Sequence, residues 1–114
     1  MQQLCLALPI QPGKTQALKE WVKTITESRW GEYEDFQRRS RVQRVTWCLQ
    51  SSPHGDQLLI YNEGDDFPRL ISEFAVSTHP FDLWVKQQAQ EITGVDMGKF
   101  EPSRLPELLL TYGY

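Results

Sequence analysis

The sequence has few of the residues that form metal and redox sites. It contains two cysteines and two histidines in 114 residues, and neither pair has the spacing of zinc ligands or of a CxxC motif. The motifs of nucleotide-binding loops, serine hydrolases and zinc proteases are also missing. We therefore expect no metal and no cofactor. Cys5 and Cys48 are expected to be buried, reduced thiols, as in a cytoplasmic protein.

Basic charge and long apolar runs are also scarce. The net charge of −3 and the pI near 5.3 lack the basic excess of a nucleic-acid or anionic-membrane surface. The first apolar run, MQQLCLALPI, is too short to span a bilayer and has no basic flank, so we interpret it as a strand and not as a signal peptide. No nucleic-acid or membrane partner is expected. The 39% hydrophobic content, with four tryptophans, is typical of a packed chain, and we expect a single domain over residues 1–114.

The most informative segment runs from Arg41 to Glu63 and predicts a β-hairpin. Two alternating, β-rich runs flank the turn residues SSPHG. Pairing Gln50 with Gln57 gathers apolar side chains on one face, and a slip of one residue would move each set to the wrong face. The pairs on the first face are Leu49–Leu58, Trp47–Ile60 and Val45–Asn62, and those on the second are Cys48–Leu59, Thr46–Tyr61 and Arg44–Glu63.

Helical periodicity predicts four helices. They are one with Leu18, Trp21, Val22 and Ile25 on its buried face, a shorter one over 29–40 broken from the first near Gly31, one with Pro68 in its first turn that ends near Ser77, and one from Pro80 to a stop at Gly94. The aromatic stripe of the second helix, Trp30, Tyr33 and Phe36, is interpreted as cover for the sheet edge, with a lid over a pocket as the alternative.

These elements predict an α+β fold of the ferredoxin-like split βαβ type. Strands are expected near 3–9, 42–50, 57–63 and 107–112, in a four-stranded antiparallel sheet with the helices on one face. Right-handed crossovers give the strand order 4-1-3-2, which places the first strand centrally. The other sheet face has no cover from its own chain although it carries Cys48, Leu59 and Tyr61. We therefore expect a homodimer that buries this face.

The element order, the length and the run STHPFDLWVKQQAQEITGVDMG resemble small uncharacterised proteins of the dimeric α/β-barrel superfamily. The resemblance implies two ferredoxin-like protomers packed sheet to sheet. That superfamily includes cofactor-free monooxygenases, haem-degrading enzymes and proteins with no known activity, so the resemblance implies no particular chemistry. The haem-degrading enzymes of the superfamily use an axial histidine to bind haem, and neither His54 nor His79 can be assigned that role.

The candidate site residues are few. His79, Arg44 and Tyr61 are weak catalytic candidates, although His79 is better interpreted as a helix-entry residue and His54 as an exposed turn residue. Arg44 and Glu63 are expected to form a partly buried ion pair. The residues expected to bind a ligand are Trp47, Tyr61, Trp84, Arg44 and Glu63.

Three hypotheses for function follow from this sequence. The leading one is a small homodimeric α/β-barrel protein of unassigned activity that binds an apolar small molecule. The second is a cofactor-independent monooxygenase-like or isomerase-like enzyme, and the third is a regulatory or scaffolding subunit. A cavity with convergent polar groups would favour the enzyme. A filled interior would favour a protein without catalytic activity.

Overall fold

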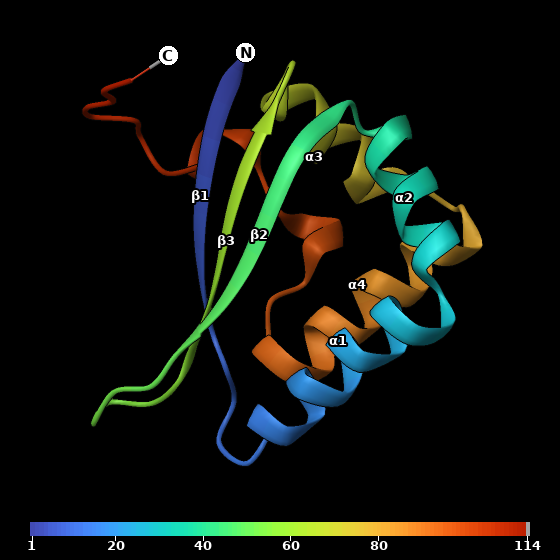
Figure 1. Ribbon diagram of the computed structural model, residues 1–114, viewed down its shortest axis with the longest axis vertical. Coiled ribbons are helices and arrows are strands. Elements are labelled where there is room, and N and C mark those ends of the chain that lie inside the picture. The colour runs from blue at the N-terminus through green and yellow to red at the C-terminus, as the bar shows by residue number, and fades with distance from the viewer. Residues whose placement is uncertain (114) are drawn as a thin grey trace.

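A computed structural model describes residues 1–113, and over these residues a three-stranded antiparallel sheet is covered on one face by four α-helices (Figure 1). The strands are β1 (Gln2–Pro9), β2 (Val42–Gln50) and β3 (Gln57–Gly64). The helices are α1 (Thr15–Ser28), α2 (Trp30–Arg39), α3 (Phe67–Val76) and α4 (Pro80–Thr93), followed by the 3₁₀ turns η1 (Met97–Lys99) and η2 (Pro102–Arg104).

The hairpin of β2 and β3 forms in the predicted register. Gln50 faces Gln57 beside the turn, and Trp47 faces Ile60 at the centre. The pairing becomes irregular only between Val42 and Arg44, at the far end of β2. The alternation of apolar side chains therefore sufficed to predict which residues share a face.

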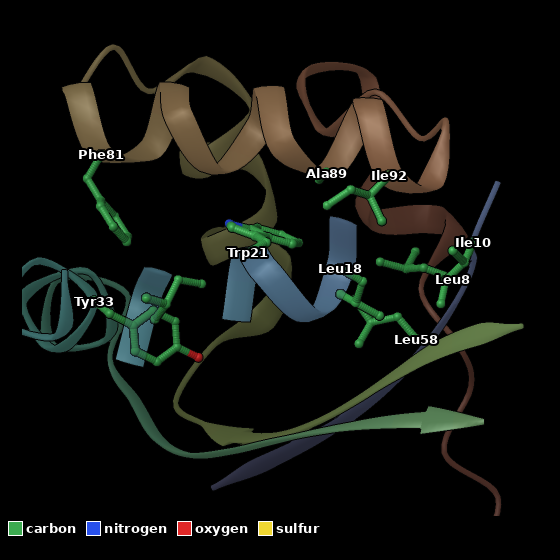
Figure 2. Close-up of a cluster of buried hydrophobic side chains, with 10 residues drawn as sticks. Leu8, Ile10, Leu18, Trp21, Tyr33, Leu58, Phe81, Ala89 and Ile92 are labelled. Atoms are coloured by element: carbon green, nitrogen blue, oxygen red, sulfur yellow. The ribbon is translucent and has the colours of Figure 1, made fainter. Parts of the chain in front are cut away.

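The core lies between the helices and one face of this sheet. Figure 2 shows Trp21 of α1 between α4 and the strands, with Leu8 and Leu58 of the sheet on the same side as Ile92 of α4. These four side chains are all buried, and Phe81, at the start of α4, is fully buried. The apolar stripes of the helices thus pack on the apolar face of the sheet, as their periodicities predict.

The sheet differs from the prediction at one edge. The strand order is β1-β3-β2, so β3 is central and β1 lies at the edge among the residues that the structure describes. The predicted strand at 107–112 is wrong, because these residues have no regular secondary structure and are exposed. Leucine, which makes up half of this segment, is not among the residues most enriched in strands, and Pro106 just before it cannot donate a backbone hydrogen bond. The order 1-3-2 agrees with the remaining part of the predicted 4-1-3-2.

Helix boundaries follow local capping residues. The side chain of Asp66 accepts a hydrogen bond from the backbone N–H of Arg69 and begins α3, with Pro68 in the first turn. Gly94 ends α4 in the left-handed conformation, with φ of 76°. The break between α1 and α2 falls at Arg29, so Gly31 lies inside α2 and does not separate the helices.

The second face of the sheet is free of helices. Cys5 and Cys48 lie on it and are exposed, which corrects the prediction that both thiols are buried. Their strands do alternate as expected, but no helix of the chain packs on their side (Figure 1). We call this surface, with Cys5, Ala7, Cys48, Leu59 and Tyr61 on it, the open face.

Candidate ligand-binding cavity

A cavity of about 120 Å³ lies between the sheet and the helices. Each of the three strands and four helices contributes to its lining, as does Met97 of η1. An engineered protein cavity of about 150 Å³ stays dry and holds benzene, so this space is of the size of a small aromatic ring. Native cores contain few voids larger than a water molecule. The cavity is therefore the strongest candidate for a functional site.

The lining is apolar apart from a few neutral side chains. It contains no Asp, Glu, Lys, Arg or His. An ionised ligand in it would lose its hydration without an opposite charge, at a cost of several kcal/mol or more. The cavity therefore suits a neutral molecule.

The neutral polar side chains of the lining differ in whether they have partners. Thr93 donates its hydroxyl proton to the carbonyl of Ala89 at 2.6 Å, and the amide of Asn62 donates to the carbonyl of Leu4 at 3.4 Å. Burial raises the pKa of the Tyr33 phenol, which keeps this group neutral. Trp21 is 4% exposed, and its Nε1 has no acceptor among residues 1–113.

Trp47 is the one predicted ligand-binding residue that lines the cavity. Its ring meets that of Trp21 edge to face, with centroids 5.0 Å apart. Tyr33 of the aromatic stripe also lines the cavity, and so does Phe36. Tyr33 also packs on Trp47 of the edge strand β2, with ring centroids 6.4 Å apart, which agrees with the interpretation of the stripe as cover for the sheet edge. The alternative, a lid over a pocket, stays a prediction.

Trp84 and Tyr61 lie elsewhere. The Trp84 ring stacks under the guanidinium of Arg29, whose Cζ is 4.1 Å from the ring centroid, and it does not line the cavity. Tyr61 is on the open face, where its hydroxyl accepts from Gln3 Nε2 at 2.9 Å and donates to Glu63 Oε2 at 2.6 Å. The structure therefore does not bring Trp47, Tyr61 and Trp84 together.

Glu63 and Arg44 are opposite each other in the register but do not form the predicted ion pair. Glu63 is 6% exposed, whereas Arg44 is exposed, and no contact between them is found among the ion pairs of residues 1–113. The irregular pairing beside Arg44 explains this, because a bulge redirects the side chains next to it. Glu63 instead binds the neighbouring hydroxyl of Tyr61.

The histidines occupy helix-entry and turn positions. His79 Nδ1 accepts a hydrogen bond from the backbone N–H of Phe81 at 3.2 Å and caps α4. His54 is exposed in the hairpin turn, where its backbone N–H donates to Ser52 Oγ. Neither histidine lines the cavity.

A buried polar cluster at the start of α4 was missed in the sequence. Asp82, 3% exposed, accepts two hydrogen bonds from Arg39 of α2 at 3.0 and 3.1 Å and one from Ser77 Oγ at 2.6 Å. From sequence alone, Asp82 is interpreted as an acid in the first turn of a helix, and Arg39 as a solvated residue at a helix end. Because these two residues are 43 positions apart, no local pattern could have paired them.

Residues 1–113 show neither a metal site nor a membrane-spanning helix. No group of three or more His, Cys, Asp or Glu side chains is placed to hold a metal ion there. No helix in that range is long and apolar enough to cross a membrane.

The chain was also compared with models of protein families, with curated proteins and with solved structures, and it matches none of them. What is shown is an α+β fold with a three-stranded antiparallel sheet and four helices over residues 1–113.

Proposed function

We propose that this protein binds a small, neutral, mostly apolar molecule in the cavity between its sheet and its helices. The observation that carries the proposal is the cavity itself: about 120 Å³ of space with an uncharged, largely apolar lining. Such sites typically enclose a ligand in an apolar wall with a few polar groups that orient it. The volume of the space is close to that of an engineered cavity that holds benzene.

A substitution that fills the cavity with a larger side chain gives the sharpest test of this proposal. Ala89 of α4 lines the cavity and is 3% exposed, so Ala89→Leu places a larger side chain in the space that the ligand would occupy. Titration of the wild-type protein with benzene should raise its melting temperature, because a ligand that binds the folded state alone stabilises it. We expect Ala89→Leu to abolish this increase.

The matched control is Ala17→Leu. Ala17 lies on α1 and packs against the core but does not line the cavity. This variant should therefore respond to benzene as the wild type does. A wild-type melting temperature that does not change at saturating benzene would contradict the proposed function.

A catalytic function receives less support than binding. His79, Arg44 and Tyr61, the catalytic candidates, do not line the cavity. No side chain of the lining titrates near neutral pH as a general acid or base must. The cavity is also not filled by the chain's own side chains, which is a point against a purely scaffolding role.

The proposed binder is a homodimer with the ferredoxin-like topology, in which two copies pack through their open faces. Cys5, Ala7 and Cys48 are exposed on this face, and Leu59 is half-buried. Leu108, Leu109 and Leu110 of the tail are 58%, 88% and 83% exposed. In Figure 1 the tail leaves the molecule on the side away from the helices, beside β1.

A second copy of the chain would cover both the open face and the exposed leucines of the tail. The outer edge of β1 has no neighbouring strand among residues 1–113, and residues 106–113 make no backbone hydrogen bond within that range. An unpaired edge and an unpaired segment can add to each other across a two-fold axis. Sedimentation at micromolar concentration should therefore give twice the 13.3 kDa of one chain.

A further inference from the structure

Asn62 is a polar side chain on the apolar inner face of the sheet. It follows Leu58 and Ile60 at alternate positions of the central strand β3, and its register partners on the two neighbouring strands are Leu4 and Val45. Asparagine is depleted in strands, and an amide on an apolar face needs hydrogen bonds to offset its loss of water. Asn62 also lines the cavity. The chain thus places an amide in the cavity wall where an apolar side chain would pack.

The protein itself satisfies this amide only in part. Asn62 Nδ2 donates to the carbonyl of Leu4 at 3.4 Å, longer than the usual length of about 2.7–3.2 Å for such a bond. Asn62 Oδ1 accepts no hydrogen bond within residues 1–113. An amide oxygen has two lone pairs that can accept hydrogen bonds, so the acceptor capacity of Asn62 is unused.

The amide oxygen of Asn62 is within reach of a molecule in the cavity. Trp21 Nε1 is the atom without a partner that residues 1–113 enclose fully, whereas Asn62 Oδ1 keeps surface that a water-sized molecule reaches. Strands flank β3 on both sides and helices cover its inner face, where Leu58 is 2% exposed but Asn62 is only half-buried. The exposed part of Asn62 therefore borders the cavity that it lines.

Other polar side chains of the lining have partners within the chain. The Thr93 hydroxyl both donates and accepts a hydrogen bond. Gln37 and Trp47 donate toward the Tyr33 hydroxyl, which partly offsets the rise in its pKa on burial. Asn62, held in place by the central strand, is therefore the best placed acceptor for a ligand.

We infer that the ligand carries a hydroxyl group that donates its proton to Asn62 Oδ1, on an otherwise apolar body such as the ring of a phenol or a cyclic alcohol. This inference rests on the proposed function and adds the chemical class of the ligand. A hydrocarbon would fill the space but leave the amide oxygen without a donor. An ammonium group would supply a donor but bring a charge into a lining without a carboxylate.

Phenol and toluene test the hydroxyl, because they share a ring and differ only in OH against CH₃. Each is titrated into the wild type and into Asn62→Leu, which removes the amide and nearly keeps its shape. Comparing the ratio of the two affinities between proteins cancels the different hydration of the two ligands. We expect Asn62→Leu to lower the preference for phenol by about threefold to tenfold, as expected for the loss of one hydrogen bond.

Thr93→Val is the matched control. It also replaces a polar side chain of the lining by an apolar one of similar shape, but the Thr93 hydroxyl is already bonded within the chain. It should change both affinities together and leave their ratio unaltered. A second measurement needs no variant: the carbon resonance of the Asn62 side-chain carbonyl should move downfield with phenol and not with toluene, whose ring current is similar.

The outcomes separate the inference from the proposed function. Suppose that phenol and toluene bind. If the ratio is unchanged in Asn62→Leu, if it falls equally in Thr93→Val, or if the carbonyl resonance does not respond to phenol, the inference is wrong and the apolar binding function remains. The same holds if benzene binds but phenol does not.

If phenol, toluene and benzene all fail to bind, the inference and the proposed function are both wrong. If Asn62→Leu does not fold, the carbonyl resonance of the wild type decides. A downfield shift specific to phenol supports the inference, and its absence overturns it.

Discussion

Asp82 is the residue on which contacts between separate helices converge. It is held by Arg39 of α2 and by Ser77 in the segment before α4, and its side chain is 4% exposed. Asp82→Ala leaves the Arg39 guanidinium, itself 35% exposed, without this partner. Because Arg39 retains water and Asp35, we expect a loss of about 2 kcal/mol in the free energy of unfolding, below the range of a fully buried pair.

Chemical denaturation of the wild type and Asp82→Ala at neutral pH measures this difference in the free energy of unfolding. Glu73→Ala is the control, because the Arg69–Glu73 pair of α3 lies on the surface and its removal should leave the stability unchanged. Equal midpoints for the wild type and Asp82→Ala would show that the cluster does not stabilise the fold.

The same carboxylate gives a pH dependence of stability. Burial alone would raise the pKa of Asp82, but hydrogen bonds from Arg39 and Ser77 outweigh it and hold this pKa below its ordinary value. The unfolded chain therefore takes up the proton first. The contribution of Asp82 is complete above a pH of about 4 and is lost as the pH falls through the lowered pKa.

We therefore expect the difference in unfolding free energy between the wild type and Asp82→Ala to shrink as the pH falls below about 4. Denaturation curves collected from neutral to acidic pH measure it. A difference that stays constant over that range would mean that Asp82 keeps an ordinary pKa in the folded protein.

At the scale of elements, a glycine that ends a helix and a glycine inside a helix should respond oppositely to substitution by alanine. Gly94 ends α4 with φ of 76°, and a Cβ there would lie 2.5 Å from Gln11 Nε2. Gly94→Ala should therefore destabilise the protein by about 1 kcal/mol or more, through backbone strain and the need to move Gln11.

Gly31 is the control for this substitution. It lies within α2, its added Cβ would meet no atom within 4 Å, and its φ is not positive. Gly31→Ala should stabilise the protein by up to about 1 kcal/mol, because alanine loses less backbone entropy in a helix. Thermal unfolding of both variants provides the comparison, and a destabilising Gly31→Ala would show that α2 needs its flexibility.

Elements with a strong internal pattern could be predicted from the sequence, and those that depend on a distant partner could not. The hairpin register follows from alternation alone, and the start of α3 at Asp66 and the end of α4 at Gly94 follow from local capping chemistry. The segment at 107–112 has neither alternation nor β-branched residues other than Thr111. Its apolar character predicts burial but does not specify which surface buries it.

The residues of the candidate site likewise divide into those that a local pattern predicts and those that depend on distant partners. Trp47 was predicted as a ligand-binding residue, and its place in the hairpin register puts it on the inward face of the sheet. Trp84 and Tyr61 are also aromatic but lie outside the cavity. Trp84 stacks under Arg29, and Tyr61 binds Glu63 on the open face. The cavity itself is lined by residues of three strands, four helices and η1, so no single segment of the sequence predicts it.

At the scale of the whole molecule, the proposed dimer can be disrupted from the open face. Cys48→Asp introduces a charge at an exposed position, so the isolated fold should tolerate it. In a dimer that buries this face the charge would be desolvated, and we expect the dissociation constant to rise by about a hundredfold or more. Leu83→Asp is the control, since Leu83 is 48% exposed on α4, an element on the opposite side of the sheet.

Sedimentation of the three proteins over a range of concentrations gives the result. The wild type and Leu83→Asp should remain dimers at concentrations where Cys48→Asp is a monomer. Identical masses for all three proteins would place the contact surface, if there is one, away from the open face.

The positions of the two thiols determine what oxidation can do to this protein. Cys5 faces Tyr61 on one side of β3, and Cys48 faces Leu59 on the other side. With a full strand between them, their Cα atoms are separated by about 9 Å or more, beyond the reach of a disulfide bond. Within one folded chain the thiols cannot cross-link. Any disulfide that the folded protein forms with itself therefore joins two copies. A band of twice the chain mass on a non-reducing gel would show that two copies had come into contact.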